Sequence, residues 1–82
     1  MDQNKIFETI ATHARDVMPA LATRQLNPTD SLKALGANSI DRSEIIMMTL
    51  ESLGLEMSLV ELARAENMGE LSEIMGRRMA SA

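Results

Sequence analysis

The chain has 82 residues, 45% of them hydrophobic, and a net charge of −4 at neutral pH. This length allows one domain with a small core, and the core must be filled by leucines and eight methionines because Phe7 is the single aromatic residue. The absence of cysteine excludes disulfides, thiolate metal sites and a cysteine nucleophile. The acidic balance disfavours nucleic acid as a partner. Since the sequence shows neither a membrane-spanning run nor a secretion signal, we expect a cytoplasmic protein with no membrane contact.

The first expected helix covers residues 3–18, where apolar residues recur at helical spacing (Ile6, Ile10, Ala14, Val17). Asp2 is its predicted cap, and Pro19 ends it because a residue before proline avoids helical geometry. Residues 19–38 then form a long connection that leucines can hold against the core (Leu21, Leu26, Leu32, Leu35). Within it, we expect Asp30 to cap a short turn over residues 31–35 that Gly36 stops.

The second long helix is predicted over residues 39–53, with Gly54 as its stop and Thr49 on its inner face. A brief helix beginning after Ser58 follows, and a last helix begins at Asn67. We expect the tail over residues 76–82 to be frayed. The predicted fold class is therefore all-α: one domain over residues 1–82, a small bundle of three main helices plus one short helix, with a long first loop.

The start of the second long helix carries the main chemical signal. Ser39 opens this helix directly after Asn38, a natural N-cap residue, and Asp41 stands where a capping box places its acidic partner. A hydroxyl at a helix N-terminus can bear an anionic group, because unpaired N–H groups and the positive end of the helix dipole lie there. In an arbitrary sequence, however, such a serine is usually only a cap.

Other catalytic or metal-binding arrangements are not expected. His13 is the single histidine, and a Ser-His-Asp arrangement would require it to lie beside Ser39. Asp41 and Glu44 are one helical turn apart, but without further ligands they indicate a solvated acidic face. No glycine-rich phosphate loop is present, since the four glycines are isolated. The residues alone therefore predict neither an enzyme nor a metal site.

The run Leu35-Gly36-Ala37-Asn38-Ser39-Ile40-Asp41-Arg42-Ser43-Glu44-Ile45 resembles the attachment site of acyl carrier proteins. The resemblance extends over nearly the whole chain, through length, acidity, the loop before the serine and the helix after it. It implies that a phosphopantetheinyl transferase attaches 4′-phosphopantetheine covalently to Ser39, and that its thiol then carries acyl thioesters. Two positions depart from the family pattern, because Asn38 replaces the usual aspartate and Ile40 the usual leucine.

The same resemblance makes the helix after Ser39 the surface that docks partner enzymes. The residues implied by position are Asn38, Ile40, Asp41, Arg42, Glu44, Met47 and Glu51. Charge supports this assignment, since residues 41–73 hold eight acids against two bases, a net of −6. We expect Met47 to be exposed among these acids, whereas Met48 is equally compatible with the core.

A narrower resemblance concerns residues 36–45 and the paired methionines that follow. They are similar to the discrete donor carriers of polyketide β-branching cassettes, which bring acetyl to a hydroxymethylglutaryl synthase homologue. This implies a discrete, monomeric acetyl donor with that synthase as its partner. Two alternatives stay open: a fatty-acid-type or other general acyl carrier, and an unmodified helical interaction module in which Ser39 is only a cap.

Overall fold

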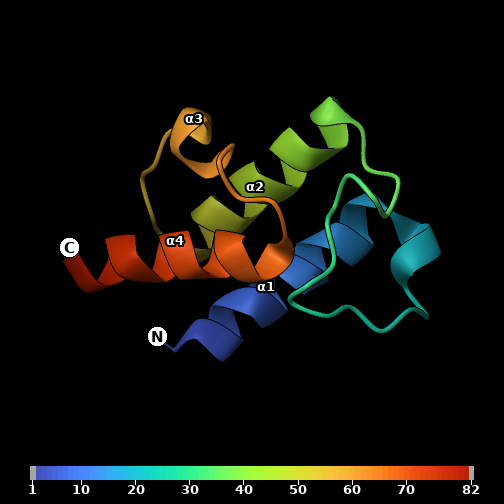
Figure 1. Ribbon diagram of the computed structural model, residues 1–82, viewed down its shortest axis with the longest axis horizontal. Coiled ribbons are helices and arrows are strands. Elements are labelled where there is room, and N and C mark those ends of the chain that lie inside the picture. The colour runs from blue at the N-terminus through green and yellow to red at the C-terminus, as the bar shows by residue number, and fades with distance from the viewer. Residues whose placement is uncertain (1, 82) are drawn as a thin grey trace.

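The computed structural model describes residues 2–81, and every regular element in that range is helical. These elements are α1 (Gln3–Val17), the 3-10 turn η1 (Pro19–Leu21), α2 (Ser39–Leu53), α3 (Leu59–Leu62) and α4 (Met68–Ser81). Figure 1 shows α1 and α4 running in opposite directions, with both ends of the chain on the same side. The predicted all-α architecture is confirmed. None of the helices in this range has the length and apolarity that a membrane span requires.

Local capping signals explain the helix boundaries. The Asp2 carboxylate accepts a hydrogen bond from the Lys5 backbone N–H at 2.9 Å, as predicted for the start of α1. Gly54 ends α2 at a φ of 63°, a left-handed conformation that glycine adopts without steric penalty. The prediction missed η1, which begins at Pro19 directly after α1 ends.

The core lies where α1 packs against α2 and α4. Its most deeply buried side chains include Ile6, Ile45 and two methionines of the last helix, Met68 and Met75. Thr49 is also fully buried, and its hydroxyl donates to the Ile45 carbonyl at 2.8 Å, so the hydroxyl is satisfied within its own helix. Flexible methionines fill the interior in place of aromatic rings.

The long connection between α1 and α2 is held down as predicted, since Leu21, Leu26 and Leu32 are buried. The predicted cap of its turn is wrong. Ser31 is the capping residue, because its hydroxyl accepts from the Ala34 N–H at 3.3 Å. Asp30 bonds in the opposite direction, and its carboxylate accepts from the Asn27 N–H at 2.7 Å. A side-chain oxygen before a turn can accept a hydrogen bond from a backbone N–H that precedes it or from one that follows it, and sequence spacing does not decide which.

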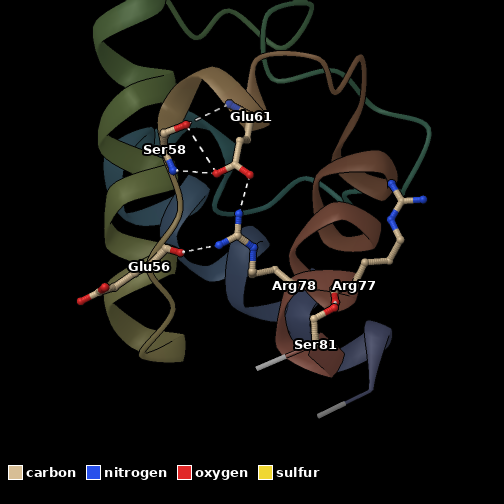
Figure 2. Close-up of polar contacts among 6 residues, drawn as sticks. All are labelled: Glu56, Ser58, Glu61, Arg77, Arg78 and Ser81. Atoms are coloured by element: carbon tan, nitrogen blue, oxygen red, sulfur yellow. Dashed lines mark hydrogen bonds and ion pairs between the residues drawn. The ribbon is translucent and has the colours of Figure 1, made fainter.

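The predicted fraying of residues 76–82 is wrong for residues 76–81, which are helical; Ala82 lies outside the described range. The cause is tertiary contact. Met79 packs against the core, and the Arg78 guanidinium donates to the Glu61 carboxylate and, at 3.4 Å, to the Glu56 carbonyl (Figure 2). The end of α4 is therefore tied to α3 and to the segment before it.

The carboxylate of Glu61 also closes a capping box at the start of α3. It accepts from the Ser58 N–H at 3.1 Å, while the Ser58 hydroxyl accepts from the Glu61 N–H (Figure 2). The backbone hydrogen bond from Ser58, with a smaller contribution from Arg78, lowers the pKa of Glu61 below its ordinary value. A single turn of helix is thus stabilised by contacts at its start and from α4.

Candidate functional site

Ser39 is the first residue of α2 and is exposed to solvent. The predicted capping box is present: the Asn38 side-chain oxygen accepts from the Asp41 N–H at 2.8 Å, and the Asp41 carboxylate accepts from the Asn38 N–H at 3.2 Å. These reciprocal bonds fix the backbone on both sides of the serine. The Ser39 side chain is therefore presented from a rigid helix start at the positive end of the α2 dipole.

The loop that leads to Ser39 is fixed by its own backbone bonds. Gly36 adopts a φ of 105°, and its N–H donates to the Lys33 carbonyl at 3.1 Å. The next N–H, that of Ala37, donates to the Leu32 carbonyl at 3.0 Å, and the Ala37 side chain is buried. The chain is therefore anchored two residues before the serine.

Arg42, one of the residues implied for docking, makes a bond within the chain. It is half-buried, and its guanidinium donates to the Ala37 carbonyl at 2.6 Å, so the side chain turns back towards the N-terminus of α2. This bond links the first turn of α2 to the loop before it. Asn38 and Asp41 are likewise used in the capping box, so three of the residues implied for docking order the helix start.

A cavity of about 540 Å³ lies beside Ser39, between α2 and α3. Its α2 wall consists of residues one helical turn apart, and its α3 wall is apolar: Ser39, Arg42, Ser43 and Ile46 face Leu59, Leu62 and Ala63. Lys33 lies on the same rim, from the turn before Ser39, and Glu66 adds one acid. Neither the role of Lys33 nor the cavity is predicted by the sequence, because neither follows from helical spacing.

The outward face of α2 carries the other implied docking residues. Ile40 and Met47 are 74% and 58% exposed, and Glu44 and Glu51 are exposed on the same stripe. The predicted exposure of Met47 is confirmed, whereas Met48 is half-buried and lies outside the core cluster. Apolar side chains thus stand among carboxylates along one face. On α3, Val60 is 79% exposed. The sequence did not predict this exposed side chain, because a helix of one turn is too short to show a periodic pattern.

His13 is not near Ser39. Its Nε2 lies 2.7 Å from the hydroxyl of Ser52, at the far end of α2, and its Nδ1 lies 3.5 Å from the Asp16 carboxylate. These three groups line none of the cavity beside Ser39. Among residues 2–81, no group of three or more His, Cys, Asp or Glu side chains is placed to hold a metal ion.

The geometry at Ser39 suits a phosphodiester-linked arm. The hydroxyl is exposed at a helix N-terminus, where anionic oxygens meet the positive end of the dipole. Two cationic side chains, Arg42 and Lys33, line the adjoining cavity. The Asp41 carboxylate accepts from the Asn38 N–H within the capping box. Asp41 therefore does not bond to the serine hydroxyl, which stays accessible.

Comparison with known proteins defines the class. The family model described as "Phosphopantetheine attachment site" matches residues 8–75, most of the chain. The chain therefore belongs to the family of carrier proteins that bear covalently attached 4′-phosphopantetheine, and it is a carrier rather than an enzyme. The predicted cofactor is confirmed.

Two relatives narrow the comparison. The chain is 43% identical, over the full length of both sequences, to the polyketide biosynthesis acyl-carrier protein AcpK of Bacillus subtilis. It also superimposes with a TM-score of 0.86 and 43% identity on a chain from the crystal structure of the curacin biosynthetic pathway HMG synthase in complex with its acetyl donor carrier, covering 90% of this chain and 95% of that one. The predicted resemblance to polyketide acyl carriers is confirmed.

Proposed function

We propose that Ser39 is the attachment residue and that the arm it bears carries an acetyl thioester. The exposed hydroxyl at the rigid start of α2 is the observation that carries the proposal. Phosphopantetheine supplies a terminal thiol that forms thioesters. The protein's own residues hold the attachment point in place, through the Asn38–Asp41 capping box, and expose it to the modifying transferase.

The acetyl donor role is supported by likeness to the acetyl donor carrier in the HMG synthase complex. We propose that this chain delivers acetyl to a hydroxymethylglutaryl synthase homologue during polyketide β-branching. The full-length match to a polyketide biosynthesis carrier favours this role over a general fatty-acid carrier.

The proposed docking surface is the outward stripe of α2. Ile40 and Met47 supply apolar contact, while Glu44 and Glu51 attract a basic patch on the partner. Asn38, Asp41 and Arg42 act on docking indirectly in this proposal, because their side chains order the start of the helix. Contacts of this kind allow brief binding, which a carrier that visits several enzymes requires.

Intact mass spectrometry tests the attachment. Co-expression with a promiscuous phosphopantetheinyl transferase should add one phosphopantetheinyl group to the parent chain and none to Ser39→Ala. Ser43→Ala is the matched control, because Ser43 belongs to the same helix and lines the same cavity. It should still be modified. Modification that persists in Ser39→Ala would exclude this serine as the acceptor.

Charge reversal tests the docking surface. Glu44→Lys and Glu51→Lys should weaken binding to the synthase, and added salt should weaken the parent complex, because the attraction is electrostatic. Glu8→Lys is the control, since Glu8 is exposed on α1, away from the α2 stripe. Equal binding by all three variants would contradict an acidic docking face.

Acetyl transfer tests the donor role. With equal loading, acetyl should pass to the synthase cysteine faster from this carrier than from a fatty-acid carrier. Met47→Ala should reduce the difference, because this exposed side chain offers a contact that charge alone does not supply. Equal transfer from both carriers would leave an acyl carrier without donor specificity.

A further inference from the structure

Two cations flank the attachment residue on the cavity side of α2. Arg42 follows Ser39 by one helical turn and lines the same cavity, and Lys33 reaches that cavity from the turn over residues 31–36. Arg42 is one of only two bases in residues 41–73, which carry a net charge of −6. Glu66 is the acid on the cavity rim, so the two cations outnumber it there.

The orientation of Arg42 adds geometric detail. Its bond to the Ala37 carbonyl, 2.6 Å long, brings the guanidinium alongside the loop that immediately precedes Ser39. A guanidinium has five N–H donors. The bond to the Ala37 carbonyl occupies one of its nitrogens, so the N–H groups of the other nitrogens remain for another acceptor. Their planar arrangement matches two oxygens of one phosphate group.

We propose that Arg42, together with Lys33, binds the phosphodiester of the phosphopantetheine arm on Ser39. The inference rests on the proposed attachment at Ser39. The guanidinium would donate its unused N–H groups to the phosphodiester oxygens, and the Lys33 ammonium would add a second positive charge from the turn before Ser39. The base of the arm is then held over the mouth of the cavity, while its thiol end stays mobile. Arg42 is thus a positioning residue for the arm.

The test compares apo and holo forms of each variant, so that any effect of a substitution on the apo fold cancels. Holo conversion should raise the thermal midpoint of the parent by about 2–8 °C, the range expected for exposed ionic contacts in a domain of this size. This increment should shrink in Arg42→Gln and in Lys33→Gln. The ³¹P chemical shift of the holo protein should change in the same two variants.

Arg64→Gln is the matched control, because it removes one positive charge from an exposed residue that lines a separate groove between α3 and α4. It should keep the parent's increment and ³¹P shift. If Arg42→Gln fails to fold, Lys33→Gln carries the test, since Lys33 is exposed.

If holo conversion raises the thermal midpoint equally in the parent and in all variants, and their ³¹P shifts are equal, this inference is overturned while the attachment stays intact. A chain that gains no phosphopantetheinyl mass at Ser39 would instead remove the proposed function, and this inference with it. Intact mass therefore separates the two failures.

Discussion

Replacement of Asn38 by alanine should destabilise the protein, because this side chain caps the helix that begins with Ser39. Its oxygen accepts from the Asp41 N–H at 2.8 Å, and alanine would leave that N–H without its protein partner. Loss of an N-cap of this type costs about 1 kcal/mol, within a range of about 0.5–2 kcal/mol. For a domain of this size, that loss lowers the thermal midpoint by about 4–8 °C.

Asn38→Asp should behave differently and stay within about 0.5 kcal/mol of the parent. An aspartate keeps the capping oxygen and gains from the positive end of the α2 dipole. It also places a second carboxylate close to that of Asp41, which lies 3.2 Å from the backbone nitrogen of residue 38, and the repulsion offsets the gain. We therefore expect the parent and Asn38→Asp to have similar stability, and Asn38→Ala to be less stable than both.

Urea and thermal unfolding of the apo proteins, followed by circular dichroism, would measure this order without any effect of the arm. Asn4→Ala is the control, because Asn4 lies exposed in the first turn of α1 and alanine is the better helix former. It should lose no stability. An Asn38→Ala protein as stable as the parent, or an Asn38→Asp protein as weakened as Asn38→Ala, would refute the capping argument.

Two further predictions concern the rest of the fold. The pKa of Glu61 is lowered in the folded state, so its ionised carboxylate stabilises the protein at pH values above its ordinary pKa near 4.5. This contribution disappears as the pH falls through the lower pKa of the folded state. The difference in unfolding free energy between the parent and Glu61→Gln should therefore become smaller when unfolding is measured at increasingly acidic pH. Gly76→Ala should stabilise α4 by about 0.5–1 kcal/mol, since the added methyl group meets only ordinary contact at 3.5 Å. Gly69→Ala should lose stability instead, because its methyl group would lie 3.0 Å from both the side chain and the carbonyl oxygen of Pro28. Equal melting shifts for the two alanine variants would contradict this contrast.

The sequence predicts α2 over the range that the structure shows, and the reason is local. Asn38 and Gly54 mark its two ends, and the pairing of Asn38 with Asp41 follows from spacing alone. The same locality explains the cap of α3 by Ser58 and the back-bonded hydroxyl of Thr49.

What the sequence does not predict depends on contacts between distant segments. The end of α4 is helical because Arg78 reaches Glu61, a pairing 17 residues apart that helical periodicity does not encode. Arg42 turns inward because the Ala37 carbonyl is available behind it, and that depends on how the loop packs. Lys33 joins the candidate site for the same reason, since the cavity is formed by separate segments: the turn that holds Lys33, α2 and α3.

The periodicity of α2 separates three roles on one helix. Ile45 and Thr49 face the core, whereas Ser39, Arg42, Ser43 and Ile46 repeat at the same spacing along the cavity. Ile40, Glu44, Met47 and Glu51 form the outward stripe. Substitutions on the cavity stripe should therefore change how the arm is held, and substitutions on the outward stripe should change which enzyme binds. The two properties can then vary independently, except at Arg42, whose bond to the Ala37 carbonyl also orders the start of the helix.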